Sequence, residues 1–166
     1  MKAENGKAVG AGSNAGVKPM EEYQYDDSYS TCVETYSALR IFSDNIPPEE
    51  ITRLLQIQPT DRFQKGDSHS QGKLKRKANG WFYSTEKLSE SKDTRRHMDL
   101  ILRALDGREG AVKKLRLDGC EIDITTYWVS VGHGGPWLMP QQMLKLGTLG
   151  IGVWWDIYFQ AEGRKQ

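Results

Sequence analysis

The stretch that most restricts the fold is residues 151–159, IGVWWDIYF. Apolar side chains recur there at every second position, which is the period of a β-strand with one buried face. The buried set comprises Ile151, Val153, Trp155, Ile157 and Phe159. Trp154, Asp156 and Tyr158 occupy the opposite face of the same strand. The chain therefore needs a sheet, and other elements that cover one side of it.

Strand-like and helix-like patterns alternate along the rest of the chain. The predicted order is strand, helix, strand, two helices, strand, helix, strand, with strands over residues 32–42, 80–86, 117–131 and 151–159 and helices over 48–55, 98–105, 111–115 and 140–146. Pro48 and Pro140 suit the first positions of their helices. Residues 61–80 have weak periodicity and many chain breakers, so we predict a long loop or irregular hairpin there.

The two ends of the patterned region resemble each other. RIFSDNIPPEEITRLLQIQP (40–59) and WVSVGHGGPWLMPQQMLKLGTLGIG (128–152) both run from a strand through a polar loop into a helix that starts with proline. This favours two βαβ-like halves in an α+β fold, as in ferredoxin-like domains, with an antiparallel or mixed sheet and helices mainly on one face. We expect one domain over residues 31–160, a flexible tail over 1–30 and a short tail over 161–166.

Composition narrows the class of protein. The 166 residues carry a net charge of +1, with 37% hydrophobic and 27% charged residues, which is typical of a soluble globular domain. Cys32 and Cys120 belong to no CxxC pair, so we expect free thiols and neither a metal site nor a disulfide framework. The chain shows no signal-peptide core and no long apolar run, which predicts a cytoplasmic protein without a membrane segment. No motif indicates a cofactor.

Several spaced features together resemble one known family. RIFSDNIPPEEITRLLQIQPT, the Lys65-Gly66-Asp67 step, the strand NGWFYST and the ending GVWWDIYF look like the bacterial domain of unknown function 4279 (DUF4279) family. The resemblance covers roughly residues 36–160. It implies a compact α+β cytoplasmic domain from a bacterium. It implies no activity and transfers no catalytic residues.

Two strand-to-helix loops hold the polar residues best suited to a small-ligand site. We expect the first and third core strands to be parallel neighbours, which would bring together Asp44, Asn45, His133, Gly134 and Gly135. Glycines let backbone N–H groups converge on an anion, and a carboxylate can orient a histidine. Lys65 completes this candidate binding set. In the alternative interpretation Asp44 caps its helix, the glycines only turn the chain and His133 is solvated.

A second hypothesis concerns aromatic side chains on the uncovered sheet face. Trp154 and Tyr158 lie opposite Trp155 on the closing strand, and either Trp128 or Tyr127 joins them, because these two neighbours point to opposite faces. We name Trp128, Trp154 and Tyr158 as the candidate interaction surface, since exposed aromatic patches are typical of protein interfaces. Alternatively, residues 61–80 or the N-terminal tail fold across these rings.

A third hypothesis rests on the basic run. Residues 61–80 hold six Lys and Arg against two Asp, close to Phe63, Trp81 and Tyr83. Cations beside aromatic rings can bind the phosphates and bases of nucleic acid. We favour a solvated loop that protects a sheet edge, because the charges are confined to this one segment.

These alternatives lead to one functional prediction. The sequence lacks the GxSxG, HExxH, Walker and GxGxxG patterns, and we predict no catalytic residue. Asp123 and Asp156 are interpreted as exposed strand carboxylates. We predict a non-enzymatic binding or protein-interaction module, whose partner is an unknown protein or a second copy. A ligand sensor or enzyme at the Asp44 and His133 loops is the rival hypothesis, and nucleic-acid binding ranks third.

Overall fold

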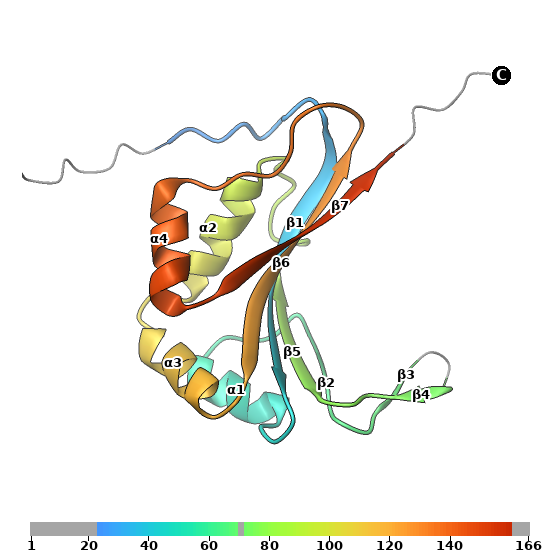
Figure 1. The fold of residues 1–166 in the computed structure, drawn as a ribbon, viewed down its shortest axis with the longest axis vertical. Coiled ribbons are helices and arrows are strands. Elements are labelled where there is room, and N and C mark those ends of the chain that lie inside the picture. The colour runs from blue at the N-terminus through green and yellow to red at the C-terminus, as the bar shows by residue number, and fades with distance from the viewer. Residues whose placement is uncertain (1–22, 70–71, 161–166) are drawn as a thin grey trace, which may run out of the picture.

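The computed structural model describes residues 23–69 and 72–160, which form a five-stranded mixed sheet, a two-stranded hairpin and four helices (Figure 1). In chain order the elements are β1 (Cys32–Ser43), α1 (Pro48–Leu55), β2 (Asp61–Phe63), β3 (Ser68–His69), β4 (Leu74–Lys75), β5 (Asn79–Ser84), α2 (Thr94–Ala104), α3 (Glu109–Leu117), β6 (Glu121–Ser130), α4 (Pro140–Leu149) and β7 (Gly152–Phe159). Pro48 and Pro140 begin their helices as predicted.

The sheet is built around β1, in the order β2-β5-β1-β6-β7. β1 is antiparallel to both of its neighbours, β5 and β6. Its register with β6 sets Phe42 opposite Glu121 at one end and Cys32 opposite Ser130 at the other. β7 runs parallel to β6, so β6, α4 and β7 form a parallel βαβ unit.

The prediction of an α+β domain with a mixed sheet is confirmed, whereas a ferredoxin-like topology is not. A ferredoxin-like domain follows the order β-α-β-β-α-β. Here α2 and α3 stand between the second and third long strands, β5 and β6. They return the chain to the end of the sheet where β1 finishes, so β6 starts there and runs back along β1. The first and third core strands are therefore neighbours, but the expectation that they are parallel is wrong.

All four helices lie on one side of the five-stranded sheet (Figure 1). The sheet contributes Leu39, Ile41, Trp81 and Ile124 to the core, each almost completely buried. The helices bury against them a larger apolar set: Ile51, Leu55, Met98, Ile101, Leu102, Leu105, Val112, Leu115, Leu146 and Leu149. Burial of these side chains is the main stabilising contribution to the fold.

Under α2 the helix-facing side of the sheet is polar rather than apolar. Ser37 on β1 bonds to Thr126 on β6 through their hydroxyls at 2.8 Å, and both residues are fully buried. His97 of α2 contacts Thr85 Oγ1 with Nδ1 at 2.7 Å and the Ser91 carbonyl with Nε2 at 2.8 Å. A carbonyl only accepts, so Nε2 carries a proton and donates it to the Ser91 carbonyl. The contact between His97 and Thr85, the residue that follows β5, links α2 to the sheet.

The sequence predicted a long loop or irregular hairpin over residues 61–80, and the described parts of this segment, 61–69 and 72–80, contain the short strands β2, β3 and β4 and the start of β5. β2 pairs with β5 at the sheet edge, and the small β3–β4 hairpin projects beyond it (Figure 1). Phe63 lies across the backbone of Gly80, where any side chain on residue 80 would collide with its ring. Arg76 stacks over the same ring at 4.0 Å from its centroid.

Burial of His97 makes the stability of the fold depend on pH. Burial lowers the pKa of His97 below its ordinary value of 6.5, so folded His97 stays neutral while the unfolded chain takes up a proton near pH 6.5. We therefore expect the free energy of unfolding to fall as the pH drops from 6.5 toward the lower folded pKa. Urea unfolding between about pH 7.5 and 5 measures this slope.

A matched pair of variants assigns the slope to one histidine. His97→Gln should be less stable than the wild type at neutral pH and should lose much of the slope. His133→Gln alters an exposed histidine and should keep it. An unchanged slope in His97→Gln would contradict the assignment.

Candidate functional site

The two loops proposed as a ligand site lie at opposite ends of the sheet. Asp44 follows the C-terminal end of β1 and His133 follows that of β6, and these strands are antiparallel (Figure 1). Asp44 instead forms an ion pair with Lys65 at 3.1 Å, in which both side chains are more than half exposed. Such a surface pair contributes little stability. Asp44 does not cap α1 either, since the N-cap residue is Pro47 and no side chain bonds there.

The other loop, residues 131–139, contacts the protein's own N-terminal segment. Gly134 has a φ of +106°, and any side chain there would collide with the Tyr29 hydroxyl. Gly132 lies close to Thr31, where an added Cβ would be 3.2 Å from the threonine methyl group, while Gly135 has open space around it and His133 is exposed. The glycines therefore accommodate a neighbouring chain segment, and the structure brings neither Asp44 nor Asn45 to this loop.

Residues 23–30, which we call the strap, cross over the N-terminal end of α2 (Figure 1). This corrects the prediction of a flexible tail for that part of the chain, while residues 1–22 and 161–166 fall outside the described residues. Asp27 accepts two bonds of 2.6 Å from the Arg96 guanidinium and one of 2.6 Å from the Ser91 hydroxyl. The Arg96 and Ser91 hydrogen bonds hold the pKa of Asp27 below its usual value.

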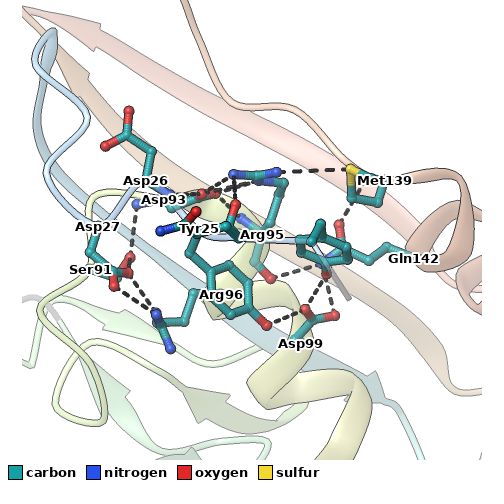
Figure 2. Close-up of polar contacts among 12 residues, drawn as sticks. Tyr25, Asp26, Asp27, Ser91, Asp93, Arg95, Arg96, Asp99, Met139 and Gln142 are labelled. Atoms are coloured by element: carbon teal, nitrogen blue, oxygen red, sulfur yellow. Dashed lines mark hydrogen bonds and ion pairs between the residues drawn. The ribbon is translucent and has the colours of Figure 1, made fainter. Parts of the chain in front are cut away.

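A buried ion pair between Asp93 and Arg95 anchors the strap (Figure 2). Asp93 caps α2 by accepting from the Arg95 amide at 2.9 Å, and it also accepts from the Asp26 amide at 2.7 Å. Arg95 Nη2 donates to the Gln24 carbonyl at 3.1 Å. Burial would raise the pKa of Asp93, but the hydrogen bonds from Arg95 and Asp26 outweigh it and keep the pKa below its usual value.

Tyrosines and α4 complete this network. The Tyr23 and Tyr25 hydroxyls both donate to Asp99 of α2, and Gln142 of α4 donates to the same carboxylate at 2.9 Å. Burial and then the bonds to Asp99 raise the pKa of both tyrosines. The Arg95 guanidinium stacks on Trp137 at 4.2 Å. Strap, α2, α4 and the loop 131–139 are thus one polar assembly.

The chemistry of this assembly favours a structural role. Its carboxylates, guanidinium groups and tyrosines form hydrogen bonds with one another and with neighbouring groups of the same chain. Most of their donors and acceptors are therefore already paired. Burial raises the pKa of the Cys32 thiol to about 11 and also raises that of Cys120, so neither is a thiolate at neutral pH. Both cysteines are free and buried. Within the described ranges no group of three or more metal-ligating side chains could hold an ion.

The face of the sheet opposite the helices, called the open face below, is rich in aromatic rings. Tyr36 on β1 stacks on Tyr127 of β6 at 4.9 Å, and Tyr158 of β7 lies 5.3 Å from Tyr127. We call these three rings the tyrosine row. Arg40 and Asp123 form a bidentate pair beside it, with bonds of 2.6 and 2.9 Å. Further along the sheet, the ring of Phe82 contacts the rings of Phe42 and Phe63.

Of the three residues named for the aromatic surface, two are exposed and one is buried. Trp154 is 65% exposed and Tyr158 49% exposed, and both belong to the open face. Trp128 is 1% exposed on the helix side, where Tyr29 packs edge-on against it at 5.5 Å. Tyr127 takes the place proposed for Trp128. The alternation within this strand was visible in the sequence, but its orientation in the sheet was not.

Two small hollows lie beside β1 at the Tyr36 end of the tyrosine row, and Glu86 lines both of them. One, of about 210 Å³, is lined by Tyr36, three glutamates and one lysine: Glu34, Glu86, Glu90 and Lys92. The other, of about 320 Å³, lies over Ala38 and is lined by Phe82, Leu88 and polar residues. Burial raises the pKa of Tyr36, with Glu86 and the neighbouring acids adding to the effect. The open face therefore offers aromatic, apolar and acidic subsites side by side.

The basic run is partly neutralised within the chain. Arg62 pairs with Glu49 at 3.3 Å and Lys65 with Asp44, while Arg76 is stacked on Phe63. Lys75 donates to the Ser68 hydroxyl at 2.6 Å. These contacts hold the segment together at the sheet edge, which matches the solvated-loop interpretation.

Comparison with known proteins identifies the family. The model of the family described as Domain of unknown function (DUF4279) matches residues 33–160, most of the chain, so this chain belongs to that family. A search of curated proteins finds no match, and a search of solved structures finds none either. Within the described part of the chain, no helix is long and apolar enough to cross a membrane.

The buried ion pair should be the anchor of the strap. In Asp93→Ala the Arg95 charge stays buried without its partner, so the free energy of unfolding should fall by about 3–5 kcal/mol. The Asp26 amide also loses its acceptor, so its hydrogen exchange should accelerate. Urea unfolding and hydrogen exchange measure the two effects.

Asp118→Ala is the matched control, because Asp118 forms an exposed pair with Lys114. It should cost less than about 1 kcal/mol and leave the strap protected. Equal losses in the two variants would show that the buried pair does not anchor the strap.

Proposed function

We propose that this member of the DUF4279 family is a non-enzymatic protein-interaction module that binds a protein partner on its open face. The observation that carries the proposal is the tyrosine row, three contacting rings on a sheet face that the helices leave uncovered. Tyrosine and arginine are enriched at protein interfaces, and their truncation often removes much of the binding energy. β1 and β6, at the centre of the sheet, hold Tyr36 and Tyr127 in place.

The charges around the row indicate the chemistry of the partner. Glu34, Glu86 and Glu90 line the hollow beside Tyr36 together with a single lysine, Lys92. A Lys or Arg side chain from the partner would enter this acidic hollow and lie against a tyrosine ring, where the cation–π attraction adds to the ion pairing. An apolar side chain fits the neighbouring hollow over Ala38. The partner surface is therefore basic and partly apolar.

A cytoplasmic location is part of the same proposal. Cys32 and Cys120 are free thiols, and unpaired cysteines are typical of proteins in reducing compartments. A small-ligand sensor built from Asp44 and His133 is not proposed, because β1 and β6 place the two residues at opposite ends of the sheet.

Site-specific photo-crosslinking in cells tests the proposal. A photoreactive amino acid at Thr125, on the open face beside the tyrosine row, should cross-link one defined partner. The same reagent at Leu144, which is 70% exposed on α4, should not capture that partner. Cross-links that form only from position 144 would contradict the proposal.

Binding of the purified partner then measures the contribution of the row. Tyr127→Ala should raise Kd about 30-fold or more, the effect of a residue worth about 2 kcal/mol, and higher salt should weaken wild-type binding. Leu144→Ala is the matched control and should leave Kd unchanged. Equal affinities of Tyr127→Ala and wild type would place the interface elsewhere.

A further inference from the structure

β7 is the last strand of the sheet, and β6 is its only strand partner among the described residues. The other side of its backbone therefore has no strand to pair with in this part of the chain. Large apolar side chains are exposed on both of its faces, led by Phe159 at 78% and Trp154 at 65%. Trp155, Ile157 and Tyr158 are also exposed. A long, apolar edge of this kind is a template for pairing with another strand.

The opposite edge of the sheet lacks these properties. β2 has three residues, and two of them, Asp61 and Arg62, are charged and exposed. Short length and charge are the usual protection of an edge strand against pairing. β7 has eight residues with a single charged side chain, Asp156, and no proline. One edge of the sheet is thus protected, and the other is suited to pairing.

We propose that the β7 edge pairs with the β7 edge of a second copy of this chain. A two-fold axis perpendicular to the sheet would make the two strands antiparallel and join the sheets into one of ten strands. The helices of both copies then lie on the same side, and the two open faces are continuous. This edge contact is distinct from the proposed binding of a protein partner to the tyrosine row, although both include open-face residues of β7.

Side-chain chemistry selects one register. In an antiparallel pair, side chains directly opposite each other lie on the same face of the sheet. Two copies of one strand meet this condition only if some residue lies directly opposite its own copy, and the two-fold axis passes beside that residue. An axis at Asp156 would set two carboxylates against each other, which is unfavourable. An axis at Trp155 would leave Tyr158 opposite Gly152, with no side chain to contact. An axis at Ile157 avoids both faults.

The register centred on Ile157 is self-complementary on both faces. On the helix side Ile157 meets its own copy, and Trp155 meets Phe159 of the other copy. On the open face Asp156 meets Tyr158 of the other copy, whose hydroxyl can donate to it. Tyr158 already donates to Asp156 within one chain, at 3.2 Å. Edge residues that match their own copies favour a second copy over an unrelated strand.

The size of the contact indicates a dimer that dissociates on dilution. With roughly 200 Å² for each large side chain, the exposed apolar surface of β7 amounts to about 500 Å² per copy. A standard stable interface buries about 800 Å² per partner, so the backbone and neighbouring residues must supply the remainder. The monomer–dimer equilibrium should therefore be visible over an accessible range of concentration.

Sedimentation velocity of the full chain over a wide concentration range is the first test. The wild type should shift from monomer to dimer as its concentration rises. Ile157→Lys sets two ammonium groups against each other at the axis and should remain monomeric, with its circular dichroism spectrum unchanged. Leu144→Lys makes the same change on α4 and should still dimerise. A wild type that stays monomeric throughout, or a dimer that Ile157→Lys leaves intact, would overturn the proposal.

Cysteine cross-linking tests the register with milder substitutions. Opposed residues of an antiparallel pair have Cβ atoms about 4.5–5.5 Å apart, close to disulfide range, whereas diagonal neighbours are about 7–8 Å apart. Under mild oxidation, Ile157→Cys should form a disulfide-linked dimer faster than Asp156→Cys or Tyr158→Cys. The wild type is the background, because its two cysteines are buried. Fastest linkage at position 156, or none at all three, would overturn the proposed register.

The tests of the two proposals are separable. Tyr127 faces the centre of the open face, so Tyr127→Ala should weaken partner binding and leave dimerisation intact. Failure of the dimer with retained partner binding would reject only the edge pairing. Loss of partner binding in Tyr127→Ala with a normal dimer would support the open-face contact and leave the edge pairing standing.

Discussion

The antiparallel register between β1 and β6 sets the positions of every other feature. β1 is the central strand, and its hydrogen bonds to β5 and β6 decide which end of the sheet each loop occupies and which side each residue faces. Leu39, Ile41 and Ile124 then face the helices, while Tyr36 and Tyr127 meet on the other side. A slip of one residue would exchange these faces, so burial of the apolar set holds the register in place.

The strap shows how charged residues join elements that the apolar core leaves apart. The Asp93–Arg95 pair is stable in a buried position because the Arg95 and Asp26 amides and the Gln24 carbonyl satisfy the hydrogen bonds that each charge would otherwise make with water. The glycine-rich loop after β6 contributes space, since Gly134 allows the Tyr29 ring to pack closely. A loop with the composition of a ligand site therefore holds a segment of the same chain.

The placement of all helices on one side has a consequence for function. A five-stranded sheet with one covered face leaves the other in contact with water, and in this chain that face carries contacting tyrosines beside acidic and apolar hollows. The same sheet has a short, charged edge strand at β2 and, within the described residues, an edge strand at β7 with no strand on its outer side. One small domain can thus associate through its open face and along the β7 edge. Tyr127 belongs to the open-face contact and not to the edge contact.

The sequence by itself determined the α+β class and the helices that begin at Pro48 and Pro140, because these depend on local periodicity and proline geometry. Its buried set for the last strand was only partly right: Ile151 is buried, but Trp155, Ile157 and Phe159 are exposed, because β7 lies at the edge of the sheet. It also identified Trp154 and Tyr158 as exposed neighbours. Only the tertiary structure decided that β1 and β6 are antiparallel, which separates Asp44 from His133 and buries Trp128 in favour of Tyr127. The direction of each strand and the strands that it pairs with depend on contacts between residues far apart in the chain, and local sequence patterns do not determine these contacts.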